Sequence, residues 1–131
     1  MRYYFDTCIW VDLLEERNGK GIIVQQLITK IIEENGVIFY SSLTIEELGR
    51  IGYTEHDMRR LFTKTILVFT HLKKAHFSIS QKVAKKRLVP RKDVLHAYTA
   101  ADAESVLVTT DRHFEKLKDI VESKTPRELI L

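Results

Sequence analysis

Short apolar runs alternate along this chain with longer segments whose apolar residues recur at helical spacing, and this alternation limits the fold more than any other feature. The pattern predicts strands at residues 3–5, 37–40, 76–79, 105–109 and 128–131. It predicts helices at residues 7–16, 22–35, 44–51, 55–74, 81–88, 93–103 and 112–121. Because strands that alternate with helices form a parallel sheet covered on both faces, we expect an α/β fold: a three-layer α/β/α sandwich with a central parallel sheet of roughly four to five strands.

Residues 55–74 combine two patterns. The run at residues 66–69 has the composition of a strand, but the apolar residues of the whole segment follow the i, i+3, i+4 rule. We therefore predict one long helix. In such a helix Leu67 and Val68 would leave more than one face apolar, which either deep burial or a partner surface would explain.

The chain's 131 residues suit a single domain, and we expect residues 1–131 to form one. The single cysteine, Cys8, leaves no intrachain disulfide, which favours a reducing, cytoplasmic setting. No apolar run approaches the roughly 18 residues that a membrane-spanning helix needs, so we expect no membrane span.

A mild excess of positive charge, +3 with a sequence pI near 9.0, is compatible with nucleic acid but does not by itself indicate it. The distribution says more, because residues 82–92 contain six cations and no acid. Such a run forms either a solvated helix face or a surface for an anionic partner, and charge alone does not separate the two.

Acidic residues follow the predicted strands. Asp6 comes directly after the first strand, Asp111 follows the fourth, and Asp93 opens a helix after a proline turn. Glu46 and Glu47 lie in the first turn of the helix after the second strand. Because sites in open parallel sheets form at the carboxyl ends of the strands, we expect these acids to converge.

Converging carboxylates repel one another, and without metal this repulsion should raise the pKa of at least one of them. A hard divalent cation such as Mg²⁺ or Mn²⁺ relieves the repulsion, since these ions prefer oxygen ligands. A bound cation of this kind can also make water nucleophilic toward a phosphodiester. The acids therefore predict a metal site suited to cleaving nucleic acid.

The same acids have a purely structural interpretation. Aspartate is a favoured N-cap that contributes about 1 kcal/mol, so Asp6, Asp93 and Asp111 could all be helix caps. Thr44 and Glu47 fit the spacing of a capping box at the start of their helix.

Four segments resemble the motifs of one known family. At residues 3–10 an apolar strand ends in an aspartate followed by a threonine, and at residues 41–48 a glutamate precedes a leucine. Residues 92–100 hold an aspartate that leads into an Ala-rich helix, and residues 106–114 hold threonine-x-aspartate with a trailing phenylalanine. In this order and spacing they resemble the PIN domain, the fold of many small RNA-cleaving nucleases, including the toxins of VapBC-type toxin–antitoxin pairs.

The resemblance implies a metal-dependent endoribonuclease in which four acids bind Mg²⁺ or Mn²⁺. These are Asp6, Glu47, Asp93 and Asp111, with Glu47 preferred to Glu46 because the family glutamate precedes a leucine. Metal-activated water would attack the phosphodiester and leave 5′-phosphate and 3′-hydroxyl ends, with Asp93 as the candidate to orient or deprotonate it. The implied partners are RNA, an antitoxin protein and a second copy of the chain in a homodimer.

Further residues are candidates for substrate contact. Thr7 or Thr110 could hydrogen-bond an acid or the scissile phosphate, or serve as capping hydroxyls. His113 stands where many family members carry a further acid, so it could contact metal or phosphate, or simply pack at the surface. Four cations close to Asp93 could hold RNA backbone, which would make binding salt-dependent. They are Lys86, Arg87, Arg91 and Lys92.

Three other functions fit parts of the pattern. An inactive PIN-like module that binds RNA or protein would use the acids as caps, and His113 favours it. A flap-cleaving DNA nuclease of the related type would need added helices, for which 131 residues leave little room. A phosphoacceptor receiver domain would need an acidic pair after the first strand and a lysine after the last, and neither is visible.

Overall fold

The computed structural model describes residues 1–62 and 66–131, and within them it contains a five-stranded sheet whose neighbouring strands are all parallel. The strand order is β3-β2-β1-β4-β5. The strands are β1 (Arg2–Phe5), β2 (Val37–Tyr40), β3 (Leu67–Phe69), β4 (Val106–Val108) and β5 (Ser123–Lys124). The predicted α/β fold with a central parallel sheet is confirmed.

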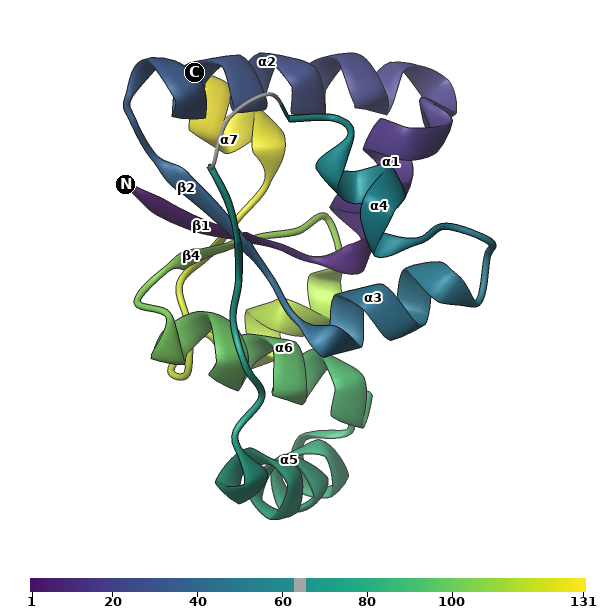
Figure 1. Ribbon diagram of the computed structural model, residues 1–131. Helices are drawn as coiled ribbons and strands as arrows, with labels where there is room; N and C mark the ends of the chain where they lie inside the picture. Colours follow the sequence, from purple (N-terminus) through teal and green to yellow (C-terminus); the bar gives the residue numbers. More distant parts are fainter. Residues whose placement is uncertain (63–65) are drawn as a thin grey trace.

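Helices cover both faces of this sheet, which gives the expected three layers (Figure 1). In Figure 1, α1, α2 and α7 lie on one side of the strands, and α5 and α6 lie on the other. The helices are α1 (Thr7–Glu15), α2 (Lys20–Glu33), α3 (Ser42–Gly49), α4 (Glu55–Arg59), α5 (Lys74–Arg87), α6 (Arg91–Asp102) and α7 (Pro126–Ile130), with 3₁₀ segments η1 (Arg17–Gly19) and η2 (Arg112–Leu117). Within the described residues, no helix combines the length and apolar character that a membrane crossing requires.

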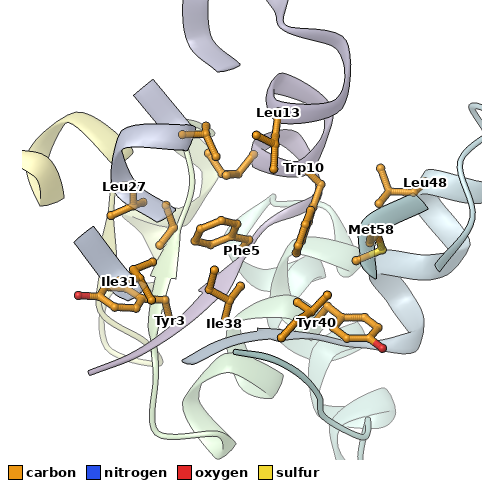
Figure 2. Packing of buried hydrophobic residues seen from close by; sticks show 14 residues of the cluster. Tyr3, Phe5, Trp10, Leu13, Leu27, Ile31, Ile38, Tyr40, Leu48 and Met58 are labelled. Atoms are coloured by element: carbon orange, nitrogen blue, oxygen red, sulfur yellow. The ribbon is translucent and has the colours of Figure 1, made fainter. Parts of the chain in front are cut away.

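The alternation of side chains along the strands divides the core into two clusters. Tyr3 and Phe5 face the α1 and α2 side, where they pack with Trp10 and other apolar residues (Figure 2). Tyr4 faces the other way and packs in a second cluster with Val94 and Leu107. Neighbouring residues of a strand point to opposite faces, so three consecutive aromatic residues serve both layers.

The strand register aligns the carboxyl ends of the three central strands. Tyr4 of β1 is opposite Phe39 of β2, and Phe5 of β1 is opposite Val108 of β4. The residues that follow these strands therefore emerge at the same edge of the sheet. This edge is where the sequence predicted that the acids would gather.

The predicted helix at residues 55–74 is wrong. Helix α4 covers only Glu55–Arg59, and β3 occupies Leu67–Phe69, while residues 63–65 of the prediction lie outside the described residues. The apolar run satisfied helical spacing, but it pairs in parallel with β2, which lies far away in the sequence. Hydrogen bonds and packing from this pairing override the local pattern.

The correction also changes the environment of two apolar residues. Leu67 is buried in the cluster under α1 and α2, and Val68 packs against the opposite cluster. They do not form the additional helix face that we considered as a partner surface. That argument for a dimer therefore no longer holds.

Two other predicted strands are helical. Residues 76–79 lie inside α5, which also contains the predicted helix at 81–88, and their apolar Phe77 and Ile79 are exposed rather than half-buried in a sheet. The segment at 128–131 overlaps α7, which begins at a proline after a threonine cap. The last strand is β5, slightly earlier in the chain.

Helix boundaries differ from prediction by up to two residues in several places, and two segments differ in ways that affect the interpretation. Helix α3 begins at Ser42, and the Ser41 amide donates to Thr44 Oγ1 at 3.2 Å, so the proposed capping box of Thr44 and Glu47 is wrong. The predicted helix at 112–121 is the shorter 3₁₀ segment η2. The shift in α3 matters for function, because it moves Glu47 out of the first turn.

Candidate active site

Asp6 lies at the junction of β1 and α1, where several donors hold its carboxylate. One oxygen accepts from the Thr7 amide at 2.8 Å, and the other accepts from Thr109 Oγ1 at 2.9 Å and Cys8 Sγ at 3.3 Å. The residue is 6% exposed. Asp6 is the N-cap of α1, so the prediction that it caps a helix is correct. The remaining contacts fix the orientation of the carboxylate at the sheet edge.

Glu47 lies beside Asp6 on the inner side of α3. Its Oε1 accepts a hydrogen bond from Thr7 Oγ1 at 2.7 Å and is 2.6 Å from His96 Nε2. Burial alone would raise the pKa of Glu47, but the contacts with His96 and Thr7 and the charge of Lys92 lower it. Glu47 is therefore stabilised as an anion by the protein itself.

His96 completes this part of the site, and the sequence reasoning missed it. The residue lies on the buried face of α6 and is 1% exposed. Its Nδ1 is 2.7 Å from the Tyr4 hydroxyl, and its Nε2 is 3.8 Å from Asp6 Oδ1. Burial disfavours the charged ring, but Tyr4, Glu47 and Asp6 together raise the pKa of His96 to about 10.

A signal for His96 was present in the sequence. It follows Asp93 by three positions, so the two residues share a face of the helix. It is also the one ionisable residue among the buried residues of the helix, which are otherwise small, apolar or hydroxyl side chains such as Val94, Ala97 and Thr99. A histidine on the apolar side of a helix requires a polar partner, and the other predicted acids can supply one.

Asp93 and Asp111 form the more open part of the site. Asp93 is the third residue of α6 and not its cap, because Pro90 holds that position. Asp111 is the cap of η2 and accepts from the His113 amide at 2.9 Å. The His113 ring approaches both acids, with Nδ1 at 2.9 Å from Asp93 and 3.2 Å from Asp111.

The pKa of Asp93 is raised to about 6. Burial is the largest cause, followed by the charges of Asp111 and Asp6, and the contact with His113 opposes them. The pKa of this acid is raised, as expected, although burial contributes more to the rise than repulsion by Asp111 and Asp6.

The site thus divides into two groups. The inner group is Asp6, Glu47 and His96, and the outer group is Asp93, Asp111 and His113. Among the described residues, the outer group is the one set of three side chains whose ligand atoms all lie within 4.8 Å of one another. Asp6 and Glu47 are not part of that set.

Thr109 connects the two groups. Its hydroxyl donates to Asp6 Oδ2 and accepts from the Asp111 amide at 3.0 Å. Thr110, which the sequence singled out, is exposed and lies 3.7 Å from Cys8 Sγ. The Cys8 thiol is no nucleophile here, since burial and the charge of Asp6 raise its pKa to about 12.

The donor set of the outer group fits a hard divalent cation. Two carboxylates supply the oxygen ligands that Mg²⁺ and Mn²⁺ prefer, and one of them is destabilised as a free anion, which a cation would correct. The imidazole of His113 is a softer ligand, more typical of transition metals than of magnesium. The set therefore tolerates Mn²⁺ at least as well as Mg²⁺.

The predicted cations differ in their surroundings. Arg87 forms two hydrogen bonds with Asp119, at 2.7 and 2.9 Å, and Arg91 donates to the Phe77 carbonyl at 2.9 Å. Both side chains thus have partners within the protein. Lys92 is half-buried and acts electrostatically on Glu47, while Lys86 is exposed.

A polar hollow of about 440 Å³ opens beside Asp111. Hydroxyl side chains and both charge signs line it, and its cations are Arg112, Lys118 and Lys124. These cations are distant in sequence from the basic run at 82–92, and the sequence reasoning did not select them. The hollow provides room for a chain of phosphates next to the outer group.

Comparison with known proteins places the chain in context. The sequence model described as "PIN domain" matches residues 3–120. A search of curated proteins finds no match. Among solved structures, the fold is similar to VapBC2 from Rickettsia felis bound to a promoter DNA fragment, with a TM-score of 0.70 and 17% identity over 95% of this chain and 98% of that one.

Two further structures are similar over comparable lengths. VapBC-1 from nontypeable Haemophilus influenzae gives a TM-score of 0.64 with 22% identity, covering 97% of this chain and 99% of that one. FitAcB from Neisseria gonorrhoeae gives 0.63 with 19% identity, covering 95% and 98%. Identities at this level establish likeness of fold.

Proposed function

This chain belongs to the PIN domain family, and from that membership and the geometry of its site we propose that it is a metal-dependent endoribonuclease hydrolysing RNA phosphodiester bonds. The observation that supports this most is the meeting of Asp6, Glu47, Asp93 and Asp111 at one sheet edge, with two of them close enough to share an ion. Helix capping alone would not require Asp93 to be buried near two other acids.

We propose that the acids of both groups hold Mg²⁺ or Mn²⁺, directly or through water. Asp93 and Asp111 would be the principal ligands, because their ligand oxygens lie within 4.8 Å of each other. When bound, the ion would supply positive charge that activates water and stabilises charge on the phosphodiester. Asp6 and Glu47 complete the negative field of the crevice.

The protein's own groups have distinct tasks in this proposal. Asp93, whose oxygens lie next to those of Asp111, is the candidate to orient or deprotonate the attacking water. Thr110 exposes a hydroxyl that can donate to a phosphate oxygen at the mouth of the crevice. Hydrolysis in this arrangement leaves 5′-phosphate and 3′-hydroxyl ends.

RNA would be held by the cations around the outer group. Exposed Lys86, half-buried Lys92 and the cations of the polar hollow are the candidates to contact the sugar-phosphate backbone. Arg87 and Arg91 contribute chiefly by fixing the basic segment against the protein. Binding should weaken steeply as salt concentration rises.

The similarity to VapBC and FitAcB structures supports a biological role as the toxin of a toxin–antitoxin pair. In this role the chain would act in the cytoplasm, as one domain spanning residues 1–131, would form a homodimer and would bind an antitoxin protein. A catalytically weak RNA- or protein-binding module is the second candidate. The observation that favours it is His113, a histidine whose ring occupies the space between two acids.

The test is cleavage of single-stranded RNA by the purified protein with Mn²⁺, compared with EDTA. Asp6→Asn and Asp111→Asn should each reduce the rate by more than the roughly 10–100-fold typical for disturbing a metal ligand's partner. Glu47→Gln has a matched control in Glu46→Gln, since Glu46 is exposed and paired with Arg50. Cleavage that persists in EDTA, or that survives in both aspartate variants, would show that this proposal is wrong.

A further inference from the structure

His96 is a buried polar residue with both ring nitrogens in use. Its Nδ1 meets the Tyr4 hydroxyl at 2.7 Å, and that hydroxyl is 2.8 Å from Ser41 Oγ. Its Nε2 meets Glu47 Oε1 at 2.6 Å. All of Ser41, Tyr4 and His96 are essentially inaccessible to solvent. A row of hydrogen bonds therefore runs from the end of β2 through the core to an acid of the site.

The direction of the last bond in this row does not depend on the charge of the ring. In neutral His96, a Tyr4 hydroxyl that donates to Nδ1 leaves the ring proton on Nε2, which donates to Glu47. In charged His96 both nitrogens donate hydrogen bonds. The Tyr4 hydroxyl then accepts from Nδ1 and donates its own hydrogen bond to Ser41 Oγ. In both cases Nε2 donates to Glu47 Oε1.

Glu47 Oε1 also accepts from Thr7 Oγ1 at 2.7 Å. Two donors, one from α1 and one from α6, thus converge on a single oxygen. Among the described residues, no hydrogen bond reaches the second oxygen, Oε2. The carboxylate is fixed in orientation, with one oxygen used by the protein and one not.

We propose that His96 is a positioning residue that commits Oε1 of Glu47 to the protein and keeps Oε2 available for the metal ion. The inference rests on the proposed function, because it assumes that Glu47 takes part in metal binding. Its physical basis is that a carboxylate prepared by fixed donors loses less freedom when it binds an ion. The same helix carries Asp93. Helix α6 therefore determines both the position of Asp93 in the outer group and, through His96, the orientation of Glu47 in the inner group.

The experiment measures Mn²⁺ binding to the full chain by calorimetry, with RNA absent. His96→Leu removes the donor while filling the space, and it should weaken Mn²⁺ affinity by about 10–100-fold. His96→Gln offers a donor at the position of Nε2, and it should restore most of the affinity that His96→Leu loses. Thr99→Val is the matched control, because Thr99 is buried on the same helix and its hydroxyl donates to the Leu95 carbonyl of that helix.

If His96 had only a structural role, its substitutions would lower the melting temperature, but His96→Leu and His96→Gln would have the same Mn²⁺ affinity. Unchanged Mn²⁺ binding by folded His96→Leu, or equal weakening in His96→Gln, overturns the inference. If His96→Leu does not fold, Thr7→Val takes its place: it removes the other donor to Oε1, should weaken Mn²⁺ binding severalfold, and overturns the inference if it does not.

The same measurement keeps the two proposals apart. Asp111→Asn serves as the reference that should abolish binding. If the unmodified protein binds no Mn²⁺, the proposed function fails and the inference fails with it. If it binds and only Asp111→Asn disturbs binding, the proposed function remains and the positioning role of His96 is wrong.

Discussion

The inner and outer groups contain the same residue types, two carboxylates and one imidazole, in opposite surroundings. In the inner group His96 is 1% exposed and its ring is fixed between Tyr4 and Glu47. In the outer group the side chain of His113 is 49% exposed and contacts the acids from the solvent side. The environment, and not the composition, therefore determines how each group behaves.

The pKa values follow this difference. In the inner group, contacts with His96 and Thr7 overcome burial and lower the pKa of Glu47. In the outer group, burial and neighbouring acids overcome the contact with His113 and raise the pKa of Asp93 to about 6. Glu47 of the inner group is an anion that the protein already stabilises, whereas the charge of Asp93 in the outer group is destabilised by burial and by neighbouring acids.

A divalent cation should therefore gain most from the outer group. Its carboxylates are partly repulsive before the ion binds, so binding removes an existing penalty as well as forming new bonds. The inner group would instead orient and support, since its charges already have protein partners. This division of labour can be tested by comparing substitutions in the two groups.

The largest expected effect is the loss of stabilisation by metal when Asp111 is replaced. Mn²⁺ at about 100 times its dissociation constant should stabilise the folded protein by about 2.7 kcal/mol. Asp111→Asn should lose nearly all of this gain, whereas Glu47→Gln should retain part of it. Urea unfolding with and without Mn²⁺ measures the difference.

The control for this comparison is Glu46→Gln, which removes an exposed acid next to Glu47 and should keep the full gain. If Glu47→Gln lost more of the metal stabilisation than Asp111→Asn, the roles of the two groups would be reversed. If no variant differed from the unmodified protein, the acids would not be where the ion binds.

The next effect concerns the metal-free protein and the charge of Asp93. Because its folded pKa is raised, the folded state binds a proton more tightly than the unfolded chain does between about pH 4 and pH 6. The stability that this proton contributes is present at low pH and is lost as pH rises through about 6. Above that pH, charged Asp93 destabilises the fold.

Asp93→Asn should remove this penalty. We expect the variant to be more stable than the unmodified protein at pH 8 by on the order of 2 kcal/mol, and equally stable near pH 4. Urea unfolding in EDTA across this range measures both. A variant less stable at pH 8 would mean that Asp93 is already compensated, and the contrast between the groups would disappear.

The inner and outer groups also differ in how far the sequence could predict them. Asp6 and Asp111 each come after a short apolar run that predicts a buried strand. Their location at one edge of a parallel sheet could therefore be predicted from the local pattern. His96 could not be identified in the same way. Its role depends on Tyr4 and Glu47, which lie on other elements and meet it only through the packing of α6 against the sheet.

The errors in the fold have a similar physical origin. Residues 67–69 form a strand because β2 is beside them, although their local spacing also suits a helix. Phe77 and Ile79 alternate like strand residues, yet they lie in α5, and in the described part of the chain no strand pairs with this segment. The local residue pattern predicts an element correctly where tertiary contacts favour the same structure. Where they favour another structure, the tertiary contacts determine it.

The smallest expected effect comes from His113, the residue on which the second candidate function depends. Its contacts with Asp93 and Asp111 are half-exposed, so His113→Asn should change metal-free stability by less than about 1 kcal/mol. His113→Asp adds an oxygen ligand and another negative charge. It should lower metal-free stability slightly and raise Mg²⁺ affinity severalfold, because magnesium prefers carboxylate to imidazole.

Calorimetry with Mg²⁺ on both variants separates the effect of charge from the loss of the imidazole, since asparagine keeps the size and lacks the charge. If His113→Asp bound Mg²⁺ more weakly than His113→Asn, further negative charge would not help at this position. The Mg²⁺ affinity of the outer group would then not be limited by the lack of a third carboxylate. His113 would instead be a hydrogen-bonding partner of the two acids, and its presence would not weaken the metal site.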